Sequence, residues 1–223
     1  MDRHPGLAPD TVTVLWCTTD GDERRKAHAL LVRSAAEMLD VPLSEIWLEH
    51  EAGGRPFLGG VGKALQVSVT HARGALAVAL TSRAPVGVDV EAVRGLRARA
   101  MARAWLDPAE AAWVTGLPEG EQSAAFLWLW TQKESVGKAL GQGLRQGGMS
   151  RQVPLPEQWP PGNGGGRLVL HPLPGVPDLA SAAVMVDEGR HIVGVALRGD
   201  AGGGSRAGGV RLEVHQVPPA ACG

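Results

Sequence analysis

Hydrophobic and polar positions along the chain follow two periods, and the shorter one predicts strands. The segment TVTVLWCT, from Thr11 to Thr18, is rich in β-branched side chains, as strands usually are. The runs ALQVSVT and ALAVALT are separated by HARG, which suits a tight turn, so a hairpin is expected there. Further strands are predicted at residues 46–51, 86–91, 167–170, 181–186, 191–197 and 210–214.

Apolar residues spaced three and four apart predict three helices, at residues 22–39, 107–116 and 123–140. The second of these opens with DPAE, which supplies an N-cap, a proline at the first helical position and a glutamate at the third. Glycine and proline predict loops at 53–62, 153–166 and 199–209.

The order of these elements is itself a pattern. A helix followed by a strand, a hairpin and a further strand occurs once before Glu91 and again after Ser123. This order favours an internal duplication of one α+β unit within the 223 residues.

Composition narrows the class of protein. With 44% hydrophobic residues the chain can bury a real core, which excludes disorder throughout. A net charge of -1 argues against wholesale polyanion binding but leaves room for a local basic patch. Cys17 and Cys222 form neither a metal-ligand spacing nor a disulfide framework, so a reducing, cytoplasmic setting is expected. No leader and no membrane-spanning run is expected either.

Two carboxylates stand out in the strand VGVDVE. A period of two places Asp89 and Glu91 on the same face. Like charges so close together are costly unless a cation neutralises them, and a hard divalent ion does this well. The alternative is an exposed strand end, which is the commoner explanation for an isolated D-x-E.

The segment WTQKESVGK places a third carboxylate between two lysines. On a helix, Trp130, Glu134 and Lys138 share one face, and Lys133 lies one step around the cylinder. This face can offer a metal ligand or base beside a phosphate-binding cation. The alternative is an ordinary surface ion pair worth roughly 0.2–0.5 kcal/mol.

Two further stretches carry polar chemistry. The turn THAR offers the hydroxyl of Thr70 and the imidazole of His71 as donors to a phosphate, although a turn histidine is more often simply solvated. Residues 93–105 are rich in arginine. They form either a solvated helix face or a docking surface for an acidic partner, and no aromatic stacking motif supports RNA binding there.

In order and combination, the motifs G-R-P, T-H-A-R-G, G-V-D-V-E and W-T-Q-K-E-S-V-G-K resemble the 4'-phosphopantetheinyl transferases of the two-lobed, Sfp-type kind. The resemblance spans about residues 22–143. It implies an α+β fold of two similar subdomains with a cleft between them, here expected at 1–106 and 107–223. The chain departs from the family pattern at Ser68, where asparagine is common, and at Ala72, where a small polar residue is common.

The resemblance also implies an activity. Such an enzyme transfers the phosphopantetheine arm of coenzyme A to a serine of an apo acyl or peptidyl carrier domain, with Mg²⁺, and releases adenosine 3',5'-bisphosphate. The matching positions make Asp89, Glu91 and Glu134 the metal ligands, with Glu134 also the base and Lys138 the partner of the leaving phosphate. The implied coenzyme A contacts are Arg24, Arg25, Arg55, Thr70, His71, Lys133 and Lys138.

Two other functions remain open from the sequence: a non-catalytic coenzyme A or nucleotide-binding module of the same fold, and another Mg²⁺-dependent phosphoryl-transfer enzyme. A duplicated chain can build its own cleft, so a monomer is expected, with no nucleic-acid or membrane partner.

Overall fold

The computed structural model describes residues 10–145, 147–161, 168–199 and 209–222. Its strands form two four-stranded sheets, in the orders β10-β1-β5-β4 and β6-β9-β8-β7, and a two-stranded ribbon, β2-β3. The strands are β1 Thr11–Thr18, β2 Leu48–His50, β3 Pro56–Leu58, β4 Gln66–Ala72, β5 Ala75–Thr81, β6 Val86–Ala92, β7 His171–Leu173, β8 Val176–Val186, β9 His191–Arg198 and β10 Arg211–Gln216. The expected α+β class is confirmed.

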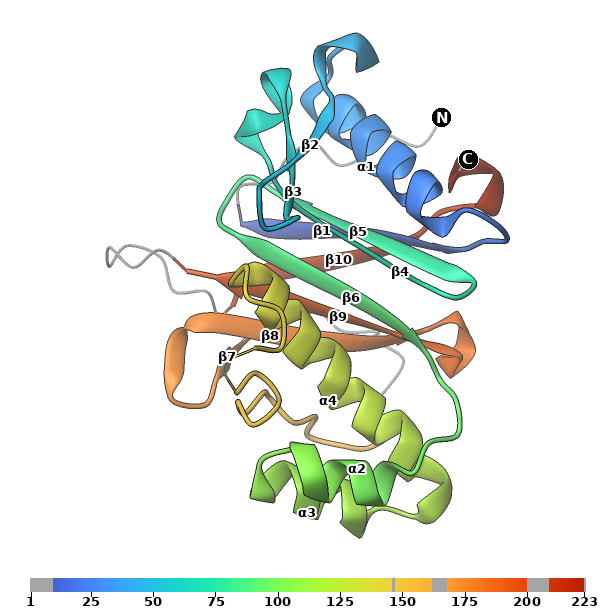
Figure 1. The fold of residues 1–223 in the computed structure, drawn as a ribbon, viewed down its shortest axis with the longest axis vertical. Coiled ribbons are helices and arrows are strands. Elements are labelled where there is room, and N and C mark those ends of the chain that lie inside the picture. Colours follow the sequence, from blue (N-terminus) through green and yellow to red (C-terminus); the bar gives the residue numbers. More distant parts are fainter. Residues whose placement is uncertain (1–9, 146, 162–167, 200–208, 223) are drawn as a thin grey trace.

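Four α-helices accompany these sheets among the described residues: α1 Glu23–Leu39, α2 Ala98–Trp105, α3 Pro108–Gly116 and α4 Glu119–Ala139. Figure 1 shows α1 on the outer side of the first sheet, α4 on the outer side of the second, and α2 with α3 at the far end of α4. The predicted helices 22–39 and 107–116 are found within a residue or two, and the third begins four residues before its predicted start at Ser123.

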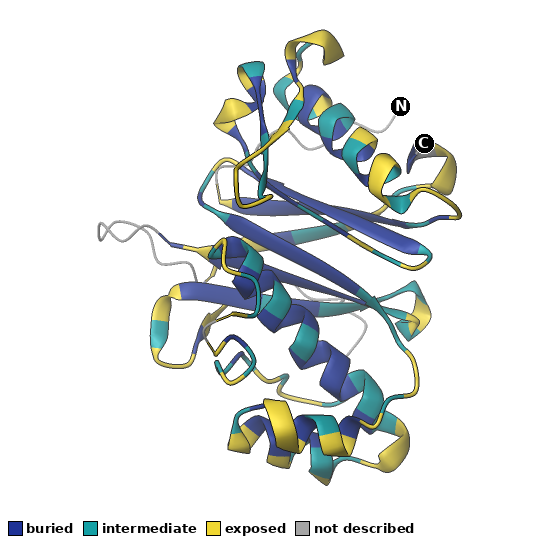
Figure 2. Cartoon of the chain, viewed as in Figure 1, coloured by how far each residue is buried: buried dark blue, intermediate teal, exposed yellow. Residues whose placement is uncertain are grey.

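The alternation of apolar residues explains how the layers pack. In β1, Val12, Val14 and Trp16 face the second sheet, whereas Leu15 and Cys17 face α1. The valines at 86, 88 and 90 pack into the same space between the sheets. Both faces of the central strands are therefore covered, and Figure 2 shows these strands as buried.

The sheets exchange strands across the predicted lobe boundary. β6 follows the β4–β5 hairpin in sequence but pairs antiparallel with β9, and β10 returns to pair parallel with β1. The boundary at 106 and 107 stays a prediction, but hydrogen-bonded strands cross it in both directions.

Several expectations for the loops change. The predicted loop at 53–62 contains β3 and the 3₁₀ turn Gly60–Ala64, because residues 56–58 pair with residues 48–50. Residue 167 of the predicted strand 167–170 lies outside the described residues, and the described part, 168–170, forms a single bridge, Val169 to Arg211, rather than a strand. Parts of the predicted loops, 162–166 and 200–208, lie outside the described residues.

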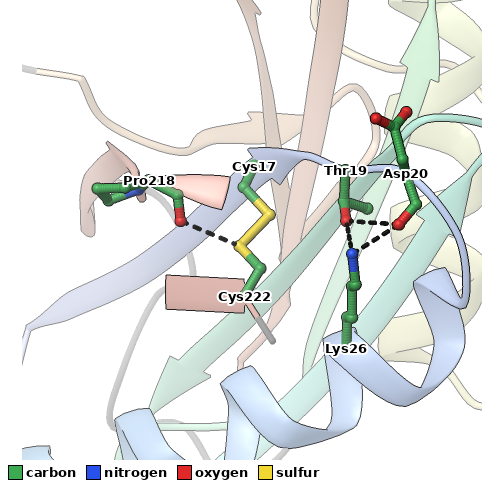
Figure 3. Close-up of a disulfide and its surroundings, with 6 residues drawn as sticks. All are labelled: Cys17, Thr19, Asp20, Lys26, Pro218 and Cys222. Atoms are coloured by element: carbon green, nitrogen blue, oxygen red, sulfur yellow. Dashed lines mark hydrogen bonds between the residues drawn. A yellow bond between two sulfur atoms is a disulfide. The ribbon is translucent and has the colours of Figure 1, made fainter. Parts of the chain in front are cut away.

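The two cysteines also correct an expectation. Cys17 of β1 and Cys222, in the 3₁₀ turn Pro219–Cys222, form a disulfide that joins positions 205 residues apart (Figure 3). The sequence spacing gave no hint of this pair, because only the fold brings the last turn against β1. Disulfides are rare in reducing compartments, so the cysteines no longer argue for a cytoplasmic setting. None of the described helices is long and apolar enough to cross a membrane.

Candidate active site at α4 and β6

Two glycines let α4 approach the second sheet closely. A Cβ atom at Gly87 of β6 would collide with the carbonyl oxygen of Ser135, and one at Gly194 of β9 would collide with the backbone of Thr131. Because both positions lack a side chain, the backbone of α4 lies almost directly on the strands. Glu134, on this stretch of α4, is thereby brought near the carboxylates of β6.

The carboxylates of β6 affect the pKa of Glu134. Burial raises the pKa of Glu134 above its ordinary value of 4.5, and the negative charges of Asp89 and, more weakly, Glu91 raise it further, while Lys138 opposes them. Asp89, Glu91 and Glu134, which the sequence placed on two separate elements, therefore share one electrostatic environment. A carboxylate with a raised pKa is a stronger base than an ordinary glutamate.

Asp89 is held by a hydroxyl and an ammonium group. Thr70 donates a hydrogen bond of 3.0 Å to Asp89 Oδ1, and the same oxygen lies 2.8 Å from Lys138 Nζ. Lys138 also donates to the carbonyl of Val88 at 2.9 Å, while the Val88 amide donates to Ser68 Oγ at 3.1 Å. Side chains from β4 and α4 thus fix the edge of β6 where Asp89 emerges.

Glu91 faces a different cation. Arg94 Nη1 lies 2.6 Å from Glu91 Oε2, and the Arg94 side chain is half exposed. A pair this accessible opens at little cost, because solvent screens its attraction.

The three carboxylates do not form a ready-made metal cage. Within the described residues, no group of three or more His, Cys, Asp or Glu side chains could hold a metal ion as the side chains stand. The donors still fit a hard divalent cation in kind and in charge, since carboxylate oxygens are its preferred ligands and, after burial, the negative charges of Asp89 and Glu91 raise the pKa of Glu134. Binding a cation here requires Asp89 and Glu91 to turn from their present lysine and arginine partners.

A cavity of about 250 Å³ opens beside Lys138. Arg55 reaches it from the loop between β2 and β3, Ser68 from β4, and Lys138 from α4. Gly141 and Gly143, just beyond the end of α4, form part of its wall. The cavity therefore combines two cations with glycine backbone and with apolar side chains of Pro56, Val67, Val69 and Val86, a combination that suits a phosphate-bearing ligand.

Thr70 and His71 point to opposite sides of β4, as neighbours on a strand do. Thr70 is buried against Asp89, whereas His71 is exposed near the first turn of α1. Burial is the main cause that lowers the pKa of His28, followed by the charges of His50, Arg24 and His71. Arg25 is exposed and pairs loosely with Asp22 at 3.7 Å. The predicted phosphate contacts are therefore dispersed: Arg24 and His71 both lie near His28, Thr70 faces the carboxylates, and Arg25 points to solvent.

Comparison with known proteins agrees with this geometry. Residues 85–162, which contain β6, α4 and all three carboxylates, match the model of the 4'-phosphopantetheinyl transferase superfamily. The predicted family resemblance is confirmed.

Two curated 4'-phosphopantetheinyl transferases are similar to the chain. One, psf-1 of Bacillus pumilus, is 29% identical over 111 residues, covering 50% of this chain and 46% of its own length. The other, gsp of Aneurinibacillus migulanus, is 28% identical over 116 residues, covering 52% and 47%. The chain spans about half the length of the curated relatives it matches.

Lys133 is the predicted contact that the structure places elsewhere. It precedes Glu134 by one residue on α4, which turns it away from the carboxylates and into the core. Its ammonium lies 2.6 Å from Glu110 of α3, and both side chains are almost wholly buried. Lys133 does not line the cavity at Arg55 and Lys138, and it forms an internal ion pair with Glu110.

The roles of two residues are hard to predict from the sequence. Ser68 differs from the 4'-phosphopantetheinyl transferase pattern, yet it accepts a hydrogen bond from the backbone amide beside Asp89. Glu110 lies in the first turn of its helix, as the sequence predicts, but it is also buried. Its signal was present, because a glutamate in a run of alanine and tryptophan becomes buried if the helix packs on that side, but its partner lay 23 residues away.

Proposed function

We propose that this chain transfers the 4'-phosphopantetheine arm of coenzyme A to a serine hydroxyl of an apo acyl or peptidyl carrier domain. The observation that carries the proposal is the cavity where Arg55 and Lys138 meet, directly beside Asp89. Phosphoryl-type transfer asks a protein mainly to position its substrates and to neutralise charge. The cations Arg55 and Lys138, together with Glu134, whose pKa is raised above its ordinary value, meet both needs.

The chemical step follows from these positions. The serine oxygen attacks the phosphorus that carries the pantetheine arm, and the bond from that phosphorus to the bridging oxygen breaks, releasing adenosine 3',5'-bisphosphate. Glu134 takes the proton of the serine, since a hydroxyl is a poor nucleophile without a base within hydrogen-bond reach. Lys138 offsets the charge that develops on the leaving phosphate.

Asp89, Glu91 and Glu134 would hold the magnesium ion, with Asp89 exchanging its contact with Lys138 for the metal. When bound, Mg²⁺ neutralises the charge of the pyrophosphate. Arg24 and His71 are proposed for the 3'-phosphate, and Arg55 for the pyrophosphate or adenosine. Thr70 is proposed to position Asp89, because its hydroxyl is already used there.

The carrier is proposed to dock on an apolar groove of about 400 Å³ lined by Trp105, Trp130, Leu144 and Met149. Trp130 precedes Glu134 by four residues on α4, so the groove lies one helical turn from the proposed base. Arg99 and Arg103 are exposed on α2, the helix that ends in Trp105. A basic rim suits the acidic surface that the family resemblance implies for carrier domains.

The test is an intact-mass assay with purified protein, Mg²⁺ and coenzyme A against a panel of apo carriers. The expected result is addition of the arm's mass to at least one carrier. Glu134→Gln should abolish transfer and leave coenzyme A binding largely intact, as measured by calorimetry. Absence of a mass shift on every carrier, from folded protein, overturns the proposal. The monomeric state and the cytoplasmic location stay predictions.

A further inference from the structure

The buried pair Glu110–Lys133 is connected to one irregular segment. Lys133 Nζ donates to the carbonyl of Arg151, and the amide of Val153 donates 2.9 Å to Glu110 Oε1. Each charged group therefore also bonds to the backbone of residues 151–153. This segment has no helix or strand of its own to hold it.

Two further side-chain hydrogen bonds fix this segment. Gln152 Nε2 donates 2.9 Å to Asp107, the N-cap of α3. The amide of Gln132 donates 3.2 Å to the carbonyl of Pro154, and its oxygen accepts 2.9 Å from Ser181 of β8. Every residue from 151 to 154 is thus bonded to α3 or α4, or to the cap of α3.

Stability alone does not explain such a pair. Burial lowers the pKa of Lys133 and raises that of Glu110, so the interior disfavours both charged forms. Apolar residues of similar size often replace a buried ion pair at no loss of stability. What an apolar pair cannot supply is the donor to Arg151 and the acceptor for Val153.

The segment that the pair holds leads into the wall of the groove. Gly147, Met149 and Ser150 line the groove opposite Trp105 and Trp130. A shift of residues 151–153 would move this wall, because only one bond separates Ser150 from Arg151. The cavity at Arg55 and Lys138 includes no residue of the segment.

Resting on the proposed function, we infer that Glu110 and Lys133 are positioning residues: they fix residues 149–154 on α4 and so set the shape of the surface that receives the carrier. They act on the carrier's binding and leave the binding of coenzyme A unaffected.

The experiment removes both charges together. In Glu110→Leu with Lys133→Met, no unpaired charge is left behind, so the protein is expected to unfold near the wild-type denaturant concentration. Hydrogen exchange should speed up about tenfold or more at the amides of residues 151–154, with protection in the centre of α4 retained. KM for the carrier should rise about tenfold, and KM for coenzyme A should change less than about twofold.

A matched control removes a partly exposed pair far from the groove, Arg211→Met with Glu213→Leu, whose charged atoms are 3.6 Å apart. It should change neither the exchange of residues 151–154 nor either KM. The inference is overturned if the segment keeps its protection in the first double variant, or if it loosens with an unchanged KM for the carrier. It is also overturned if the two KM values rise alike. If the wild type modifies no carrier, the proposed function fails, while the exchange measurement still reports on the pair.

Discussion

Lys138 has a structural role beside β6 and a proposed role in the chemical step. Its ammonium bridges Val88 and Asp89 and also lines the cavity. Lys138→Met should lower kcat/KM for transfer by about 100-fold or more, because it removes a cation placed where charge develops. Lys63→Met, at an exposed position, is the control. A Lys138→Met protein that loses thermal stability but transfers at the wild-type rate would make the residue an ordinary ion pair.

His28 gives the first sheet a pH-dependent stability. Its pKa in the folded protein lies below 6.5 because of burial, then the neighbouring charges of His50, Arg24 and His71, with Asp22 opposing. As the pH falls through 6.5, the unfolded chain binds a proton at His28 before the folded protein does. The free energy of unfolding is therefore highest above pH 6.5, and it decreases as the pH falls from 6.5 to the pKa of His28 in the folded protein. Melting temperatures from about pH 7.5 to about pH 5.5 should fall less steeply in His28→Gln. Equal slopes would contradict this prediction.

At the scale of elements, the contact of α4 with the second sheet depends on glycine. Gly194→Ala places a methyl group against the backbone of Thr131, which cannot move as a side-chain end can. The expected loss is about 1–3 kcal/mol of unfolding free energy, by urea denaturation, with a parallel loss of transfer because Glu134 shifts. Gly95→Ala, where a Cβ meets nothing within 4 Å, is the control. Equal stability of the two variants would show that α4 adjusts freely.

The elements also show what the sequence can predict. Period-two patterns located β1, β4, β5 and β6, and the helix pattern placed Glu134 and Lys138 on one face, because those properties are local. The pairing of β6 with β9 was beyond prediction, since alternation fixes the face of a strand but not its neighbour. For the same reason, the carboxylates could be identified as a candidate set while the partner of Lys133 could not.

At the scale of the whole molecule, the Cys17–Cys222 disulfide ties the last turn to β1 and, through it, to the outer side of the first sheet. A disulfide that closes so long a loop restricts the unfolded chain. Cys222→Ser should therefore lower the free energy of unfolding by roughly 2–5 kcal/mol in the absence of reductant. The melting temperatures of wild type and variant should converge once dithiothreitol is added. Identical melting before reduction would mean that the bond does not form in solution.

The parallel pairing of β1 with β10 has a consequence for synthesis of the protein. The ribosome synthesises β10, the strand that covers the open edge of β1, roughly 10–40 seconds after β1 itself, at about 5–20 residues per second. During that interval β1 presents unpaired backbone groups to any other nascent chain. Of the two four-stranded sheets, the one that contains β1 is therefore begun before the other and completed after it, by the same strand that leads to Cys222.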